Sequence, residues 1–92
     1  MIKQFRHKGL ERFFARDDTS GINPQFAPKL RRMLTVLNDS NGPQGMNIPN
    51  YRLRPMKGDR NGQWAVWVSG NWPLVFQFEG KNVVNVELVD YH

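Results

Sequence analysis

The hydrophobic positions of this chain follow one period in its first half and another in its second half. Apolar residues over positions 10–14 recur at the spacing of a helix face, and a longer apolar stripe runs from Phe26 to Leu37. From Tyr51 onward, the segments YRLRPM, QWAVWVS, PLVFQFE and VVNVELV show the period of two that is typical of β-strands. The pattern therefore predicts two helices followed by four strands, which is an α+β fold.

The predicted boundaries rest on specific residues. Asn23 can cap a helix, and Pro24 suits the first helical position, so the second helix should begin there. The segment NDSNGPQGMNIPN is rich in glycine, proline and asparagine, which predicts a long loop between the two halves. Ile2 to Phe5 is expected to form a short additional strand. His7, alone at a helix start, is interpreted as structural.

The four predicted strands must be antiparallel neighbours. Only GDRNG, GNW and EGKN separate them, whereas a parallel crossover needs a dozen or more residues. Asn61-Gly62 is the strongest hairpin signal. We therefore predict an antiparallel meander with the two helices packed on it, as a single domain over residues 1–92.

The apolar faces of the last two strands predict their register. A loop at residues 80–82 pairs Leu74 with Leu88 and Phe76 with Val86. This register carries the end of the chain to the level of Trp72. We expect Trp64, Phe76 and Phe78 to belong to the core, and Trp72 is left open between core and site.

The same register gathers polar side chains at one end of the sheet. Asp90 lies level with Trp72, and folding the Tyr51 strand back brings residues 52–54 to that end as well. We therefore expect Arg52 and Arg54 to converge with the terminal residues Asp90, Tyr91 and His92. Pairing of the last strand would anchor the end of the chain.

This set of side chains suits cleavage of RNA without a metal. The 2′-hydroxyl attacks its own phosphate when one group removes its proton and another protonates the leaving 5′-oxygen. His92 is a plausible proton donor, Asp90 a base or an orienting group, and Tyr91 a hydrogen-bond donor or a stacking surface. The predicted phosphate contacts are Arg52, Arg54, Lys57 and Arg60. Arginine opposite aspartate at a sheet end is also typical of a surface ion pair without catalytic activity.

Composition limits the alternatives. The 92 residues carry 13 Lys and Arg against 8 Asp and Glu, and the net charge of +5 favours polyanions. With no cysteine and two distant histidines, the chain has no disulfide or thiolate site, and we expect neither metal nor cofactor. No apolar run is long enough for a membrane span and no signal segment begins the chain, so we expect a cytoplasmic protein without membrane contact.

Several segments in order resemble the HigB family of bacterial toxins. They are MIKQFRHKGLERFF, YRLRPMKGDRNGQWAV, VSGNWPLVFQFE and the terminal VELVDYH, and together they span nearly the whole chain. The resemblance implies a RelE/ParE-like fold and a ribosome-dependent endoribonuclease that cuts mRNA in the A site. It also implies a HigA-type helix-turn-helix antitoxin, with operator DNA contacted only through that antitoxin.

The resemblance assigns residues, and at two positions this chain departs from the family. Asp90, Tyr91, His92 and Lys57 match the family's catalytic residues, but the family often has histidine at Arg54 and arginine at Pro73. Arginine is a poor general base, so Arg54 can replace only a phosphate contact. Two alternatives therefore stay open, a catalytically weakened toxin that mainly binds its antitoxin and a ParE-like inhibitor of DNA gyrase.

Overall fold

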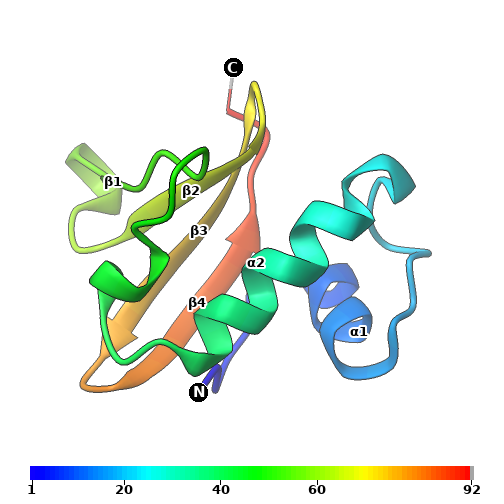
Figure 1. Cartoon of the computed structure of the whole chain (residues 1–92), viewed down its shortest axis with the longest axis horizontal. Coiled ribbons are helices and arrows are strands. Elements are labelled where there is room, and N and C mark those ends of the chain that lie inside the picture. Colours follow the sequence, from blue (N-terminus) through cyan, green and yellow to red (C-terminus); the bar gives the residue numbers. More distant parts are fainter. Residues whose placement is uncertain (92) are drawn as a thin grey trace.

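The computed structural model describes residues 1–91, and in this range one α-helix crosses a face of a four-stranded sheet while the other lies to the side, beyond the last strand (Figure 1). The helices are α1 (Lys8–Arg16) and α2 (Ala27–Asp39). The strands are β1 (Arg54–Pro55), β2 (Trp64–Ser69), β3 (Trp72–Glu79) and β4 (Asn82–Leu88). Short 3-10 turns cover Pro24–Phe26, Pro43–Met46 and Gly58–Arg60. The predicted α+β fold is confirmed.

The sheet is the predicted meander. Its strand order is β1-β2-β3-β4, and every neighbouring pair is antiparallel. Ile2 and Phe5 form isolated parallel bridges to Val83 and Val86, so the predicted N-terminal strand is reduced to two bridges along the outer edge of β4. This segment covers backbone groups that β4 would otherwise leave unpaired.

The predicted register of β3 and β4 is correct at one end and wrong at the other. Leu74 pairs with Leu88 as expected, but a β-bulge prevents the expected pairing of Phe76 with Val86. The strands are joined by a tighter turn than residues 80–82, because Glu79 already pairs with Asn82. The bulge absorbs the resulting one-residue shift, and Asn85 adopts a left-handed φ of 55° within it.

β1 is much shorter than the predicted strand from Tyr51. Asn50 and Arg52 have φ values of 80° and 54°, which interrupt the extended backbone. The segment nevertheless remains next to β2, because the Tyr51 carbonyl accepts a 2.8 Å hydrogen bond from the Trp67 N–H.

The Asn61-Gly62 turn closes a longer connection than a two-residue hairpin. Asn61 has φ −55° and ψ 134°, Gly62 has φ 94°, and the Gln63 N–H donates to the Arg60 carbonyl at 3.0 Å. These values describe a type II turn, in which the glycine supplies the positive φ. The preceding 3-10 turn at Gly58–Arg60 makes the connection long enough to fold over one face of the sheet.

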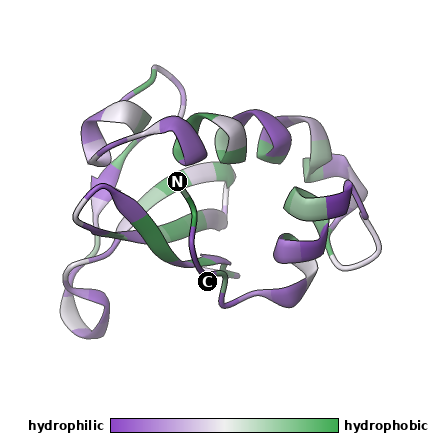
Figure 2. Cartoon of the chain, turned by 90° about the horizontal axis from the view of Figure 1, so that it is seen from below, coloured by the Kyte–Doolittle hydropathy of each residue, from purple (hydrophilic) through white to green (hydrophobic). Residues whose placement is uncertain are grey.

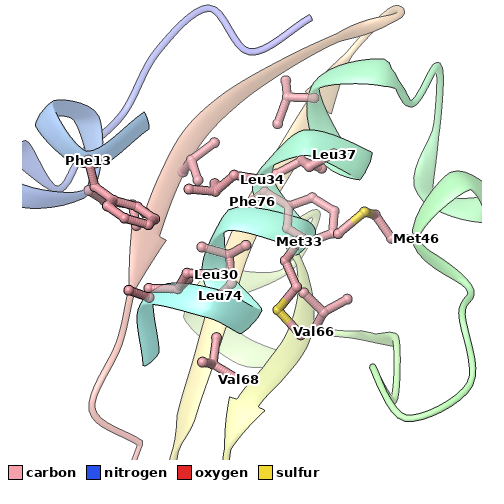
Figure 3. Close-up of a cluster of buried hydrophobic side chains, with 14 residues drawn as sticks. Phe13, Leu30, Met33, Leu34, Leu37, Met46, Val66, Val68, Leu74 and Phe76 are labelled. Atoms are coloured by element: carbon pink, nitrogen blue, oxygen red, sulfur yellow. The ribbon is translucent and has the colours of Figure 1, made fainter. Parts of the chain in front are cut away.

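The core lies between α2 and the sheet (Figure 3). The α2 side chains Leu30, Met33, Leu34 and Leu37 are fully buried, as the apolar stripe predicted. Each such side chain contributes roughly 1.5–3 kcal/mol on burial. They pack against fully buried sheet residues, which include Val66, Leu74 and Phe76. Figure 2 shows the same arrangement by hydropathy, with hydrophobic stretches along α2 and the strands and mostly hydrophilic connections.

The helix starts follow the sequence closely. The Asn23 side chain accepts a 3.0 Å hydrogen bond from the Gln25 N–H, and the 3-10 turn it caps leads directly into α2. His7 caps α1, since its Nδ1 accepts from the Leu10 N–H at 2.9 Å. The structural interpretation of His7 is therefore confirmed.

Four aromatic side chains of β2 and β3 lie on the helix side of the sheet. Phe76 is fully buried, and Trp64 and Phe78 are partly buried against the core, as predicted. Trp72 contacts Phe26 with ring centroids 5.7 Å apart, so it belongs to the helix side.

In the described part of the chain, no helix is long and apolar enough to cross a membrane.

Candidate functional site

We call the side of the sheet that faces away from α2 the open face. Val66, Leu74 and Leu88 pair across β2, β3 and β4 and point toward the helix. Side chains alternate along a strand, and directly paired residues share a face. The neighbouring rows therefore point to the open face. One row is Arg54, Ala65, Val75 and Glu87, and the next contains Trp67 and Pro73.

A depression of about 250 Å³ lies on this open face, toward β1. Its lining residues are Arg54, Pro55, Met56, Lys57, Arg60, Trp67 and Tyr91. Three of the four cations predicted from the sequence thus meet Tyr91 around one hollow. Of the described residues, Arg52 and Asp90 were also predicted for the site but do not line it.

The end of the described chain is held in place by backbone pairing. The Val89 N–H donates to the Pro73 carbonyl at 3.1 Å, and the Tyr91 N–H donates to the Asn71 carbonyl at 2.7 Å. This places Asp90 level with Trp72, as the register predicted, and Asp90 is exposed. The segment after β4 therefore runs beside the β2–β3 turn, as Figure 1 shows. His92 lies outside the described residues.

Pro73 stands in a central strand, where proline normally costs a ladder hydrogen bond. In an antiparallel strand the N–H and carbonyl of one residue point to the same neighbour. The Pro73 carbonyl accepts from the Val89 N–H, so an N–H at position 73 would point toward Val89 as well. Val89 follows β4, which ends at Leu88. The cost of the proline is thereby confined to the end of the sheet. Its ring is buried on the open face, paired with Trp67.

Tyr91 and Arg52 both contact Trp67. The Tyr91 and Trp67 rings meet edge to face, with centroids 5.8 Å apart and an interplanar angle of 81°. The Arg52 guanidinium carbon lies 5.2 Å from the centroid of the same indole. Tyr91 still keeps 52% of its surface exposed, so its ring remains accessible to a ligand.

Arg60 is held by partners within the protein. Its Nη1 lies 3.1 Å from Gln63 Oε1 and 3.5 Å from Glu87 Oε2. Arg6 reaches the same Glu87 oxygen at 3.3 Å. The Glu87 carboxylate therefore partly balances the charge that Arg60 brings to the depression.

Arg54 and Lys57 present their charges without such balance. Both side chains are exposed, and within residues 1–91 neither forms an ion pair. Arg54 is fixed in β1 opposite Ala65, and Lys57 precedes the 3-10 turn at Gly58–Arg60. These two cations are the ones best able to attract an anion into the depression.

A second hollow, of about 330 Å³, lies between α1 and α2. Phe13, Phe14 and Leu34 contribute to its wall, while Arg31 and Asp17 at its rim form an ion pair with each other. None of the predicted site residues within the described range 1–91 lines it. The open-face depression is therefore the better candidate for the chemistry.

Trp67 and Glu87 are site features that the sequence did not assign. Trp67 alternates with Val66 and Val68, and that phase alone marks it as facing away from the helices. Glu87 is the charged residue of β4. Its partners come from distant segments, and no local pattern predicts them.

Comparison with known proteins identifies the family. Residues 3–92 match the family model of HigB-like toxins, described as RelE-like toxins of type II toxin-antitoxin systems. Endoribonuclease HigB of Proteus vulgaris is 36% identical over 92 residues, which is 100% of both chains.

Solved structures share the fold at low identity. A YafQ mutant from E. coli superimposes with a TM-score of 0.64 at 17% identity, covering 98% of this chain and 91% of that one. A YoeB/ParE toxin from Agrobacterium tumefaciens gives a TM-score of 0.57 at 14% identity, covering 99% of this chain and 96% of that one. The fold and the full-length sequence match agree, and the chain belongs to the HigB-like family of RelE-like toxins of type II toxin-antitoxin systems.

Proposed function

We propose that this protein is a toxin that cleaves mRNA in the ribosomal A site during translation. Its relative in Proteus vulgaris is named an endoribonuclease and matches over the whole chain. The observation that carries the proposal is the meeting of Arg54, Lys57 and Tyr91 around one small depression. Two cations and an accessible aromatic ring are the groups that hold an RNA phosphate and the base beside it.

The size of the depression suits this substrate. At about 250 Å³ it is smaller than the pockets that enclose whole drug-sized ligands. It can hold a phosphate and part of the adjoining nucleotide, while the rest of the RNA stays outside. In this proposal the ribosome holds the part of the mRNA that stays outside the depression.

The proposed reaction is attack of the RNA 2′-oxygen on the adjacent phosphorus. The O2′–P bond forms and the P–O5′ bond breaks, which leaves a 2′,3′-cyclic phosphate and a 5′-hydroxyl. A base takes the 2′-hydroxyl proton and an acid gives a proton to the leaving 5′-oxygen. Asp90 and His92 divide these two transfers, because Arg54 keeps its proton and Lys57 acts as a cation.

The cations stabilise the charge that grows on the phosphate. Lys57 and Arg54 reach it from the β1 side, and Arg60 adds a charge that Glu87 partly balances. A single donor of this kind typically contributes 10²- to 10³-fold in rate. Tyr91 stacks on the exposed base or donates a hydrogen bond to the phosphate.

In this function the toxin has an antitoxin as its protein partner and acts in the cytoplasm. A HigA-type helix-turn-helix antitoxin restrains the toxin, and operator DNA is contacted only through that antitoxin. Residues 1–92 act as one domain in the cytoplasm, where ribosomes and mRNA are found. Co-expression with the helix-turn-helix protein of the neighbouring reading frame, if one is encoded there, should restore growth that the toxin alone stops.

Cleavage mapping tests the activity. Purified protein is added to translating ribosomes, and new mRNA 5′ ends are mapped beside those made by an Asp90→Ala/His92→Ala double variant. We expect cuts at A-site codons from the wild-type protein and none from the variant. Failure of the wild-type protein to cut, or identical cuts by the variant, would refute the mechanism.

Inhibition of DNA gyrase is the second candidate, since the fold is shared with a YoeB/ParE toxin. A supercoiling assay with gyrase separates the two. Truncation after Val89 removes Asp90, Tyr91 and His92, and it should abolish RNA cleavage but spare any inhibition of gyrase. A catalytically weakened toxin would instead bind the antitoxin normally and cleave slowly in the same ribosome assay.

A further inference from the structure

Three side chains form a continuous stack beside the depression, which we call the Trp67 stack. The Arg52 guanidinium carbon lies 5.2 Å from the Trp67 ring centroid, and the Tyr91 ring meets the same indole at 5.8 Å. Trp67 and Tyr91 line the depression, whereas Arg52 does not line it but lies over the Trp67 indole. One side chain thus contacts both an aromatic ring and a cation of the candidate site.

The backbone at Arg52 is held in a conformation that arginine rarely adopts. Its φ is 54°, in the left-handed region that favours glycine. Pairing with β2 before and after Arg52 fixes this conformation. The Tyr51 carbonyl accepts from the Trp67 N–H at 2.8 Å, and Arg54 pairs with Ala65. Strained non-glycine residues persist where the neighbouring structure determines them, and they cluster at functional sites. This conformation directs the Arg52 side chain over the open face.

The position opposite Trp67 supplies no charge of its own. Pro73 pairs with Trp67, shares the open face with it and is buried. Val89, which follows across the sheet through its 3.1 Å hydrogen bond to the Pro73 carbonyl, is also uncharged. Within residues 1–91, the positive charge at this level of the face comes from Arg52 lying on the indole.

We propose that Trp67 is a positioning residue for RNA cleavage, a role that rests on the function proposed above. Its indole holds the Arg52 guanidinium and the Tyr91 ring at fixed places beside the depression. Arg52 thereby provides a cation for the phosphate at the level where β3 carries Pro73. Tyr91 follows the end of β4, and its ring stays against Trp67 where both residues line the depression. The exposed part of the Tyr91 ring then faces the RNA.

The proposal predicts which kinetic constant changes. A guanidinium that is free to rotate still attracts RNA, but it spends less time where charge develops in the transition state. Loss of Trp67 should therefore lower the maximal single-turnover rate. The ribosome concentration that gives half of that rate should stay the same, since the contacts with the ribosome are not altered.

Three variants of the stack and one control test this role. Trp67→Leu removes the shared ring, Trp67→Phe keeps a smaller ring, and Arg52→Gly removes the cation while relaxing the left-handed backbone. Trp72→Leu is the matched control, because Trp72 is also a partly buried tryptophan but contacts Phe26 on the helix side. Melting temperatures are measured for all variants, and cleavage is assayed well below the lowest of them.

We expect Trp67→Leu to lower the maximal rate by roughly threefold to tenfold, as the loss of one aromatic or cation–π contact implies. Trp67→Phe should recover part of the rate. Arg52→Gly should melt no lower than the wild-type protein and yet cleave more slowly. The double variant Trp67→Leu/Arg52→Gly should lose less rate than the product of the two single losses, because Trp67 acts in part through Arg52.

The outcomes separate the positioning role from the function itself. Wild-type rates for Trp67→Leu or Arg52→Gly, in the presence of an active wild-type protein, would overturn the positioning role alone. A loss of rate in Trp72→Leu equal to that in Trp67→Leu would also overturn it, because it would trace the effect to stability. No cleavage by the wild-type protein would overturn the proposed function and this inference with it.

Discussion

Arg60 and Glu87 meet across the open face of the sheet, with Nη1 and Oε2 3.5 Å apart. Arg60 belongs to the connection between β1 and β2, and Glu87 lies in β4. Ala65 and Val75, which are aligned with Glu87 across the sheet, are both fully buried. The ion pair thus fastens the connection that carries Lys57 over the face that holds the depression.

The Glu87 carboxylate also opposes the binding of an anion near Arg60. We expect Glu87→Gln to leave Arg60 a hydrogen-bond acceptor but to remove the compensating charge. The affinity for a short single-stranded RNA at low salt should rise about fivefold, since nearby unit charges interact by roughly 1 kcal/mol near a solvated surface. Fluorescence anisotropy with a labelled RNA measures this, and unchanged or weaker binding would show that Arg60 does not face the RNA.

Gly9 and Gly21 allow the start of α1 to contact the loop that precedes α2. A Cβ built on Gly9 would lie 2.4 Å from the Gly21 carbonyl oxygen, a distance that requires the backbone to move. We expect Gly9→Ala to lower the free energy of unfolding by about 1–3 kcal/mol, as overpacking does. Urea denaturation measures the change. Gly42→Ala is the control, because a Cβ there meets nothing within 4 Å, and an equal loss in both variants would contradict the account.

The His7 side chain should stabilise α1 by capping its N-terminus. Its Nδ1 accepts the Leu10 N–H at 2.9 Å, and loss of an N-cap acceptor typically costs about 1 kcal/mol. We therefore expect His7→Ala to lower the free energy of unfolding by that amount and His7→Asn to retain most of it. Thermal unfolding of the three proteins at neutral pH compares them, and equal stability of the alanine and asparagine variants would exclude the cap.

Alternation along the strands made one face of the sheet predictable. Leu74 and Phe76 keep one phase in β3, and Val86 and Leu88 keep one phase in β4, so these core positions and the level of Asp90 followed from pattern alone. Trp67 was not assigned by the same reasoning, because a large aromatic side chain at strand spacing is typical of a core as well as of a binding surface. Its contacts with Arg52 and Tyr91 join three segments that are distant in sequence.

The errors in register have a local cause that the pattern does not reveal. Gly80 adopts a φ of 61° in a turn that closes one residue earlier than expected. Asn85 then occupies the bulge, but in the sequence it reads as an ordinary polar position of an alternating strand. The late start of β1 was also not predictable from the pattern. It follows from the positive φ of Arg52, which depends on the pairing of its neighbours with β2.

The central claim is that the open-face depression is where RNA is cut, and Lys57 tests it most directly. Lys57 lines the depression, is exposed and forms no ion pair within residues 1–91, so its loss should leave the melting temperature unchanged. Lys81→Ala is the matched control, an exposed lysine in the β3–β4 turn. The measurement is the single-turnover rate of mRNA cleavage on translating ribosomes. We predict that Lys57→Ala lowers this rate by about 10²- to 10³-fold while Lys81→Ala does not, and equal rates for the two variants would contradict the account.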